Sequence, residues 1–177
     1  MLNKRKSFII AGGGTGGHLF PALAIGDALK KRFPNVTIHF VGSKFGLESK
    51  ILPERGDGHT LLTIRGFMRG ISPRALFRNL LFPMRFAIAY LKSRRLIKRF
   101  SPVVVIGTGG YASGLPLLAA IHKKIPTVIH EQNSYPGVTT RWLSSRATRV
   151  CLSYEDARRH LKKKVVLSPA TRFGRTL

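Results

Sequence analysis

Two glycine-rich turns are the segments of this sequence best suited to chemistry. The first runs from Gly12 to Gly17 and leads directly to His18, and the second runs from Gly107 to Gly114. Each follows a short apolar run of the kind that forms a buried strand. At such a turn, bare backbone N–H groups and the start of a helix can face a phosphate. Two turns of this kind predict a shared binding cleft for an anionic ligand.

His18 follows the first glycine turn, close to the expected start of a helix. An imidazole in that place can act as a base toward a reacting hydroxyl near neutral pH. The alternative is a histidine that only caps the helix or packs against its neighbours. The residue by itself favours this second interpretation.

A third polar segment, His-Glu-Gln-Asn at 130–133, ends the apolar run 127–129. Four consecutive polar side chains at a strand end are not expected in a core. Glu131 could accept hydrogen bonds from sugar hydroxyls, and no other acidic residue precedes it back to Asp57. Ordinary loop polarity explains the segment equally well.

The first turn also satisfies the spacing G-x-G-x-x-G, through Gly12, Gly14 and Gly17. A dinucleotide site of that kind needs an acidic residue at the end of the second strand to hold a ribose. Here the second apolar run ends at Ser43 and Lys44, which disfavours a Rossmann-type oxidoreductase. The Gly-Lys-Ser/Thr ending of a Walker loop is also missing. A tight turn that binds no ligand is the remaining alternative, although the segment contains more glycines than a turn needs.

Apolar runs alternate with helix-like segments along the chain. We expect strands at 7–11, 37–41, 60–64, 103–106, 127–129, 149–152 and 165–167, and helices at 21–32, 47–54, 74–81, 83–100, 115–122, 138–144 and 155–161. Pro83 favours the start of the longest helix. The alternation predicts an α/β fold with a Rossmann-like, doubly wound parallel sheet. In such sheets ligands bind beyond the carboxyl ends of the strands, where both glycine turns lie.

The composition points to anionic partners. The 177 residues include 31 lysines and arginines against 7 acidic residues, a net charge of +24, and 44% are hydrophobic. The hydrophobic content excludes a disordered basic tail and suits one domain with a sizeable core. The charge favours phosphates, nucleic acid or an anionic membrane surface. A basic nucleic-acid-binding α/β domain is therefore the alternative function, although no recognised nucleic-acid motif is present. The single cysteine, Cys151, is typical of a reducing compartment.

Taken together, these segments resemble the MurG family of bacterial glycosyltransferases. The resemblance spans about residues 7–167 and rests on three motifs in order: Gly-Gly-Thr-Gly-Gly-His at 13–18 with 20–24, the turn 107–114, and His-Glu-Gln-Asn at 130–133 with Gly137, Thr139, Arg141, Trp142 and Leu143. Members of the family transfer N-acetylglucosamine from UDP-N-acetylglucosamine to lipid I, which is undecaprenyl-diphospho-muramoyl-pentapeptide. The product, lipid II, serves peptidoglycan synthesis.

The resemblance implies the N-terminal, acceptor-side half of a GT-B fold, in which two Rossmann-like domains face each other across a cleft. It also implies roles for individual residues. The UDP-sugar contacts fall on Thr15, Gly16, Gly17 and Asn133. His18 and Glu131 are the expected catalytic residues, with His18 either the base or at least an acceptor-site residue. The acceptor cleft is lined by Tyr111 and Glu131, with Gly109 and Gly110 as further substrate-binding residues. It implies neither a cofactor nor an active-site metal. The sequence likewise shows no acidic pair that would hold a magnesium ion beside a diphosphate.

The resemblance implies that the basic region contains a membrane-binding patch. Its expected members are the apolar Ile71, Leu76, Phe77, Leu80, Leu81 and Phe82 and the basic Arg74 and Arg78. Apolar residues with a basic surround suit contact with an anionic leaflet, where each basic residue contributes about 1 kcal/mol. The implied location is peripheral, on the cytoplasmic face of the bacterial inner membrane. Burial of the same apolar side chains in the core is the alternative.

Family members continue into a second domain that carries most donor contacts, whereas this sequence ends at Leu177. We expect 1–167 to be the acceptor-side domain, 168–177 to be an out-of-frame tail, and the C-terminal donor domain to be absent. Residues 169–174 read Pro-Ala-Thr-Arg-Phe-Gly where the family has Gly-Asn-Pro-Val-Arg. A single nucleotide sequence can encode both peptides when it is read in two different reading frames. A frameshift near Leu167 or Ser168 accounts for this. The chain alone is then expected to have negligible transferase activity, because one domain cannot orient both substrates.

Overall fold

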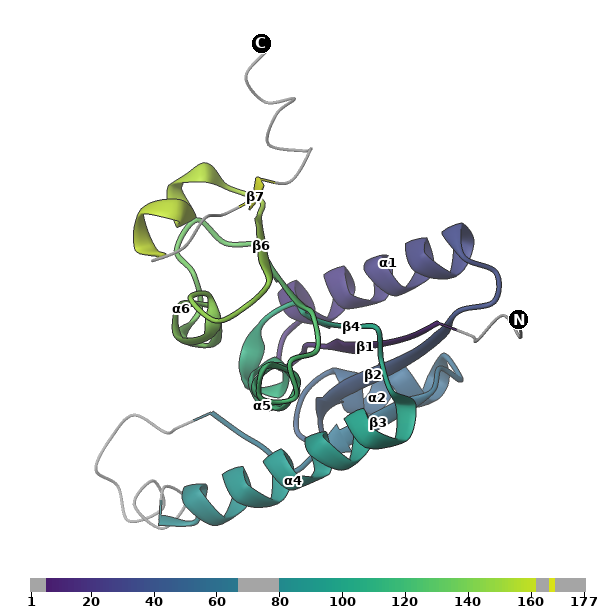
Figure 1. Cartoon of the computed structure of the whole chain (residues 1–177). Coiled ribbons are helices and arrows are strands. Elements are labelled where there is room, and N and C mark those ends of the chain that lie inside the picture. Colours follow the sequence, from purple (N-terminus) through teal and green to yellow (C-terminus); the bar gives the residue numbers. More distant parts are fainter. Residues whose placement is uncertain (1–5, 67–79, 162–165, 168–177) are drawn as a thin grey trace.

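A seven-stranded parallel sheet forms the centre of the molecule (Figure 1). The computed structural model describes residues 6–66, 80–161 and 166–167. The strands are β1 (Ser7–Ala11), β2 (Thr37–Ser43), β3 (His59–Leu62), β4 (Val104–Gly107), β5 (Thr127–Glu131), β6 (Arg149–Leu152) and β7 (Val166–Leu167). Their order is β3-β2-β1-β4-β5-β6-β7, so the chain winds outward from β1 in both directions. This confirms the predicted doubly wound α/β fold.

Helices cover both faces of the sheet. Two of them, α1 (Gly16–Arg32) and α2 (Glu48–Glu54), pack on one face through Leu19, Leu23 and Leu52. The other face carries α4 (Phe82–Phe100), α5 (Gly110–His122), α6 (Val138–Leu143) and the 3-10 helix η1 (Glu155–His160). Figure 1 shows α1 across the sheet from α4 and α5. The strands β1 and β2 therefore have little contact with water, apart from the exposed Thr37.

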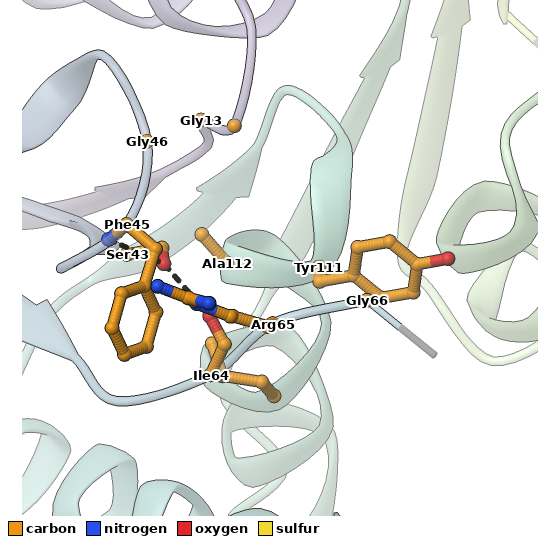
Figure 2. Close-up of a pocket in the computed structure, with 10 residues that line it drawn as sticks. Gly13, Ser43, Phe45, Gly46, Ile64, Arg65, Gly66, Tyr111 and Ala112 are labelled. Carbon is orange, nitrogen blue, oxygen red and sulfur yellow. Dashed lines mark hydrogen bonds between the residues drawn. The ribbon is translucent and has the colours of Figure 1, made fainter. Parts of the chain in front are cut away.

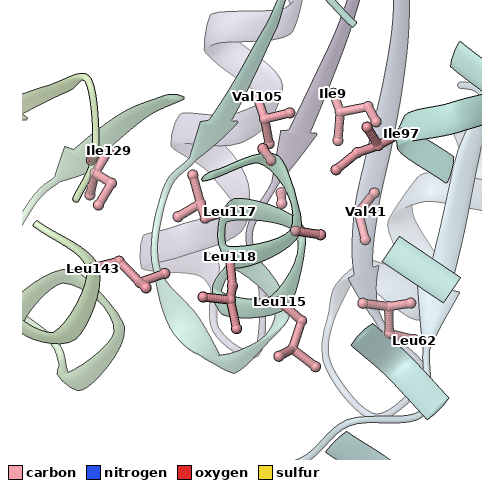
Figure 3. Close-up of a cluster of buried hydrophobic side chains, with 14 of the residues drawn as sticks. Ile9, Val41, Leu62, Ile97, Val105, Leu115, Leu117, Leu118, Ile129 and Leu143 are labelled. Carbon is pink, nitrogen blue, oxygen red and sulfur yellow. The ribbon is translucent and has the colours of Figure 1, made fainter. Parts of the chain in front are cut away.

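The two hydrophobic cores explain why the central strands β1 and β4 are almost entirely apolar. In β1, Ile9 points to the core beneath α5 and Ile10 to the core beneath α1. Figure 3 shows Leu117 of α5 near Val105, with α5 lying between β2 and β5. Because both faces are covered, β1 and β4 do not alternate between polar and apolar residues.

The helices that follow the glycine turns begin earlier than the sequence predicted. Helix α1 begins at Gly16 rather than Pro21, and α5 begins at Gly110 rather than Leu115. Glycine disfavours a helix when judged by propensity alone, so the turns were expected to lie outside the helices. Tertiary packing overrides that preference. The amides of Gly16 and Gly17 in the first turn, and those from Gly110 onward in the second, therefore belong to helix N-termini.

The other elements lie close to their expected positions. Helix α4 begins at Phe82 with Pro83 in its first turn, as predicted. Strands β2 and β5 extend two residues further, to Ser43 and Glu131, while the segment expected as a helix at 155–161 is a 3-10 helix. Most of the helix expected at 74–81 lies outside the described residues.

Helix α4 exposes an apolar stripe. Met84, Ile88 and Leu91 are 55%, 46% and 49% exposed, whereas Ala89 and Ile97 on the opposite side are buried. Among the described residues, no helix is both long enough and apolar enough to cross a membrane. The stripe is thus a surface feature of a packed helix.

A buried histidine in β2 makes the fold sensitive to acid. His39 stacks on Phe100 with the ring centroids 4.2 Å apart, and its Nε2 lies 2.9 Å from Thr60 Oγ1. Burial, followed by the charges of His59 and Arg99, lowers the pKa of His39 from 6.5 to about 4. Because the unfolded chain binds this proton more readily, the free energy of unfolding falls as the pH drops from 6.5 toward 4.

Between pH 7 and pH 4.5, we expect the free energy of unfolding to fall by about 2 to 3 kcal/mol more in wild type than in the variant His39→Gln. The measurement is urea unfolding of both proteins at the two pH values. An equal pH dependence in wild type and variant would show that His39 is not the responsible group.

Candidate functional site

The two glycine turns lie against each other at the carboxyl ends of β1 and β4. These strands are neighbours in the sheet, which brings the turns together. Thr108 Oγ1 donates a hydrogen bond to the carbonyl of His18 at 2.7 Å. A side chain at Gly110, whose φ is +72°, would overlap the carbonyl oxygen of Gly13. The contact therefore depends on the absence of a Cβ.

His18 is held in one orientation by the second turn. Its Nδ1 lies 3.1 Å from the carbonyl oxygen of Thr108. A carbonyl can only accept, so in the neutral ring Nδ1 carries the proton and Nε2 keeps its lone pair. Gly109 leaves the space for the ring, because a Cβ there would lie 2.6 Å from Nδ1. The result is an imidazole whose free nitrogen can accept a proton.

Gln132 completes the same network. Its Nε2 donates to the carbonyl of Thr108 at 2.9 Å and lies 3.0 Å from Nδ1 of His130. Burial lowers the pKa of His130, against the opposing charge of Glu131. The side-chain oxygen of Gln132 is buried and has no hydrogen-bond partner within the described parts of the chain. The sequence did not predict a role for Thr108 or Gln132, because each contacts residues that follow a different strand of the sheet.

Glu131 is at the site, but its carboxylate is already engaged. The side chain is 1% exposed. One oxygen accepts from the amide and the side chain of Asn133 at 3.2 and 2.8 Å, and the other accepts from the amide of Gly137 at 3.0 Å. This geometry favours a role in holding the loop 131–137. It does not favour the direct contact with sugar hydroxyls that the sequence suggested.

A pocket of about 170 Å³, here called the His18 pocket, joins these segments. Its lining residues are His18, Gly109, Gly110, Tyr111, Glu131, Gly137, Val138, Thr139 and Thr140. The structure thus brings five of the expected site residues to one cavity. The other four, Thr15, Gly16, Gly17 and Asn133, do not line it: the first three immediately precede His18, and Asn133 is exposed beside Glu131.

Tyr111 also lines a second pocket of about 370 Å³, here called the Arg65 pocket (Figure 2). The guanidinium of Arg65 stacks 3.6 Å from the centroid of the Phe45 ring. Within the described residues, Arg65 makes no ion pair with a carboxylate. Sequence reasoning missed both side chains, because they follow β2 and β3 and meet only through the sheet order. Gly13 and Gly14 line this pocket as well.

No cluster of three or more histidine, cysteine or acidic side chains that could hold a metal occurs in the described part of the chain. Of the expected membrane patch, Ile71, Arg74, Leu76, Phe77 and Arg78 lie outside the described residues. Leu80 is 75% exposed, and Leu81 and Phe82 are half-buried.

Comparison with known proteins agrees with this arrangement. Residues 8–152 match the N-terminal domain of glycosyltransferase family 28. The chain belongs to this family. Family 28 membership agrees with the resemblance inferred from the three motifs.

Curated relatives in the family are similar over nearly the whole chain. The chain is 44% identical over 166 residues to the UDP-N-acetylglucosamine--N-acetylmuramyl-(pentapeptide) pyrophosphoryl-undecaprenol N-acetylglucosamine transferase of Flavobacterium psychrophilum, covering 93% of the chain and 44% of the relative. It is 46% identical over 161 residues to the protein of that name from Lactiplantibacillus plantarum, covering 90% of the chain and 43% of the relative. The crystal structure of Acinetobacter baumannii MurG superposes with a TM-score of 0.74 at 28% identity, covering 92% of this chain and 44% of that one. The chain thus spans less than half the length of these relatives.

Proposed function

We propose that this chain is the acceptor-side half of a glycosyltransferase that moves N-acetylglucosamine from UDP-N-acetylglucosamine to lipid I. The observation that carries the proposal is the His18 imidazole, oriented by the Thr108 carbonyl and opening into a pocket shared with Tyr111. The names of the family 28 relatives support the choice of donor and acceptor.

In the proposed reaction, a hydroxyl oxygen of the muramoyl sugar attacks the anomeric carbon of the donor sugar. The bond from that carbon to the UDP oxygen breaks, and UDP leaves with the electron pair. Nε2 of His18 takes the hydroxyl proton, and general-base catalysis of this kind contributes roughly 10²- to 10⁴-fold to a rate. The starts of α1 and α5 place partial positive charge near the diphosphate groups.

The other site residues take supporting roles in this proposal. Thr15, Gly16, Gly17 and Asn133 contact the UDP-sugar, and Tyr111, Gly109 and Gly110 line the acceptor cleft. The Arg65 pocket offers a guanidinium to the diphosphate of the acceptor, and among the described residues this guanidinium pairs with no carboxylate. Glu131 positions the loop that carries Asn133.

A fusion experiment tests the proposed function. The chain, cut after residue 167, is joined to the C-terminal part of the Flavobacterium psychrophilum relative and assayed with UDP-N-acetylglucosamine and a lipid I analogue. We expect transfer by the fusion and negligible transfer by the chain alone, because orientation of the two substrates requires both halves. A folded fusion without transfer, or a chain active by itself, would contradict the proposal.

We also propose that the chain binds peripherally to the cytoplasmic face of the bacterial inner membrane. The exposed stripe of Met84, Ile88 and Leu91 continues from Leu80, which was expected in the membrane patch. The same helix carries six lysines and arginines and no acidic residue, and within the described residues none of the six pairs with a carboxylate. Such a face suits insertion into an anionic leaflet.

We expect Ile88→Glu to lower the affinity of the chain for phosphatidylglycerol vesicles by roughly tenfold or more, since it places a charge where apolar area would enter the bilayer. Val103→Glu is the matched control, because Val103 is 43% exposed and follows the C-terminal end of α4, outside the stripe of Met84, Ile88 and Leu91. Vesicle sedimentation measures both variants. Equal losses in the two variants, or tighter binding to duplex DNA than to vesicles at the same salt, would favour the nucleic-acid alternative instead.

A further inference from the structure

Glu48, the first residue of α2, is a fully buried carboxylate with three hydrogen-bond contacts to backbone amides. Its side chain is 0% exposed. The amide of Gly14 donates to both of its oxygens, at 3.0 and 2.8 Å, and the amide of Ser43 donates to Oε1 at 2.7 Å. The carboxylate therefore ties the first glycine turn to the end of β2.

Three glycines from three segments make room for this carboxylate. A Cβ at Gly13 or at Gly46 would overlap its carboxyl group, and a Cβ at Gly42 would overlap its Cγ. The absence of side chains at these positions is thus explained by one neighbour rather than by three independent turns. Gly13 belongs to the glycine turn, Gly42 to β2, and Gly46 to the loop before α2.

We propose that Glu48 is a positioning residue for the site: it acts as an internal anion that holds the glycine turn in place. A buried carboxylate is costly unless hydrogen bonds satisfy it, and bonds from amides to a charged acceptor are stronger than neutral ones. The position of Glu48 in the first turn of α2 adds a favourable interaction with the helix dipole. These conditions are all met at this carboxylate.

The same carboxylate limits how the turn can bind a ligand. The Gly14 amide already has an anionic acceptor, so it is not available to a phosphate. An anionic ligand at this turn then meets the amides of Gly16 and Gly17 at the start of α1. This second consequence rests on the proposed function, whereas the holding role of Glu48 does not.

Hydrogen exchange measured by NMR on the 177-residue chain tests the holding role. In Glu48→Gln, one carboxylate oxygen becomes an NH₂ group that cannot accept, so we expect the Gly14 and Ser43 amides to exchange roughly 10- to 100-fold faster. Glu54→Gln is the matched control, since Glu54 is an exposed carboxylate of the same helix. Unchanged exchange at Gly14 and Ser43 in a folded Glu48→Gln variant would overturn the proposal.

Two further measurements keep the test decisive if Glu48→Gln does not fold. Gly46→Ala retains Glu48 but displaces its carboxylate, and the same two amides should lose protection. In the unmodified chain, through-hydrogen-bond couplings should connect the Gly14 and Ser43 nitrogens to the Glu48 carboxyl carbon. Absence of those couplings would overturn the proposal without any variant.

Titration with inorganic pyrophosphate separates the two consequences. In wild type we expect shifts at the Gly16 and Gly17 amides but not at Gly14, and in Glu48→Gln we expect Gly14 to shift as well. A wild-type Gly14 amide that shifts as much as its neighbours would overturn the limit on ligand binding. No shift anywhere would count against the proposed anion site, while the exchange data would still decide the holding role.

Discussion

His18→Gln should lower sugar transfer by the two-domain fusion roughly 10²- to 10⁴-fold. The Thr108 carbonyl fixes the proton on Nδ1, so Nε2 is the nitrogen left to accept the acceptor proton. Glutamine retains polarity and approximate size but has no nitrogen that accepts a proton at neutral pH. Steady-state transfer to a lipid I analogue, with the fold checked by circular dichroism, measures the effect.

His122→Gln is the matched control for this prediction. His122 ends α5 at the opposite end from Gly110, and it is exposed with its Nδ1 2.6 Å from the Tyr90 hydroxyl. The same substitution there should leave transfer within about twofold of wild type, as expected of a surface change away from the site. A His18→Gln fusion that retains more than a tenth of wild-type activity would rule out His18 as the base.

Leu117→Ala should lower the free energy of unfolding by about 3 to 5 kcal/mol. Leu117 is 1% exposed and belongs to the core between α5 and the sheet (Figure 3). Its side chain also packs against Gly107, where a Cβ would overlap it. Because glycine has no side chain that could move, Gly107 cannot fill the cavity left by alanine. Since small domains are stable by only about 5 to 15 kcal/mol, the loss should be a large fraction of the total.

Leu91→Ala is the control for Leu117→Ala, because Leu91 is a leucine of α4 that is 49% exposed. Urea unfolding should place this variant within about 0.5 kcal/mol of wild type. Equal destabilisation by both substitutions would mean that Leu91 is packed rather than presented at the surface, which would also weaken the membrane proposal.

The fold could be predicted because the strands carry a strong local signal. Both faces of β1 and β4 are covered, so these strands are continuously apolar and stand out between helical segments. The helix starts at Gly16 and Gly110 could not be predicted in the same way. Glycine has a low intrinsic helix propensity. The reason for a glycine at position 110 is seen only in the structure, where Gly110 lies in close contact with Gly13.

The site was predictable where its residues are contiguous and not where they meet through the sheet. His18, Tyr111 and Glu131 stand in short motifs, and all three line the His18 pocket. The role of Glu48 could not be predicted, because its partners Gly14 and Ser43 come from other segments. The buried, fully hydrogen-bonded state of Glu131 was likewise hidden, since a sequence does not show which carboxylates face solvent.

The central claim is that the two glycine turns and the segment 130–133 form the acceptor half of a sugar-transfer site. Its most direct test is an NMR titration of the chain with a soluble, short-chain prenyl-diphospho-muramoyl peptide. The account predicts that the largest shifts fall on His18, on 109–111 and on 137–139, around the His18 pocket. Saturable binding that leaves those signals unchanged and shifts other residues instead would contradict it.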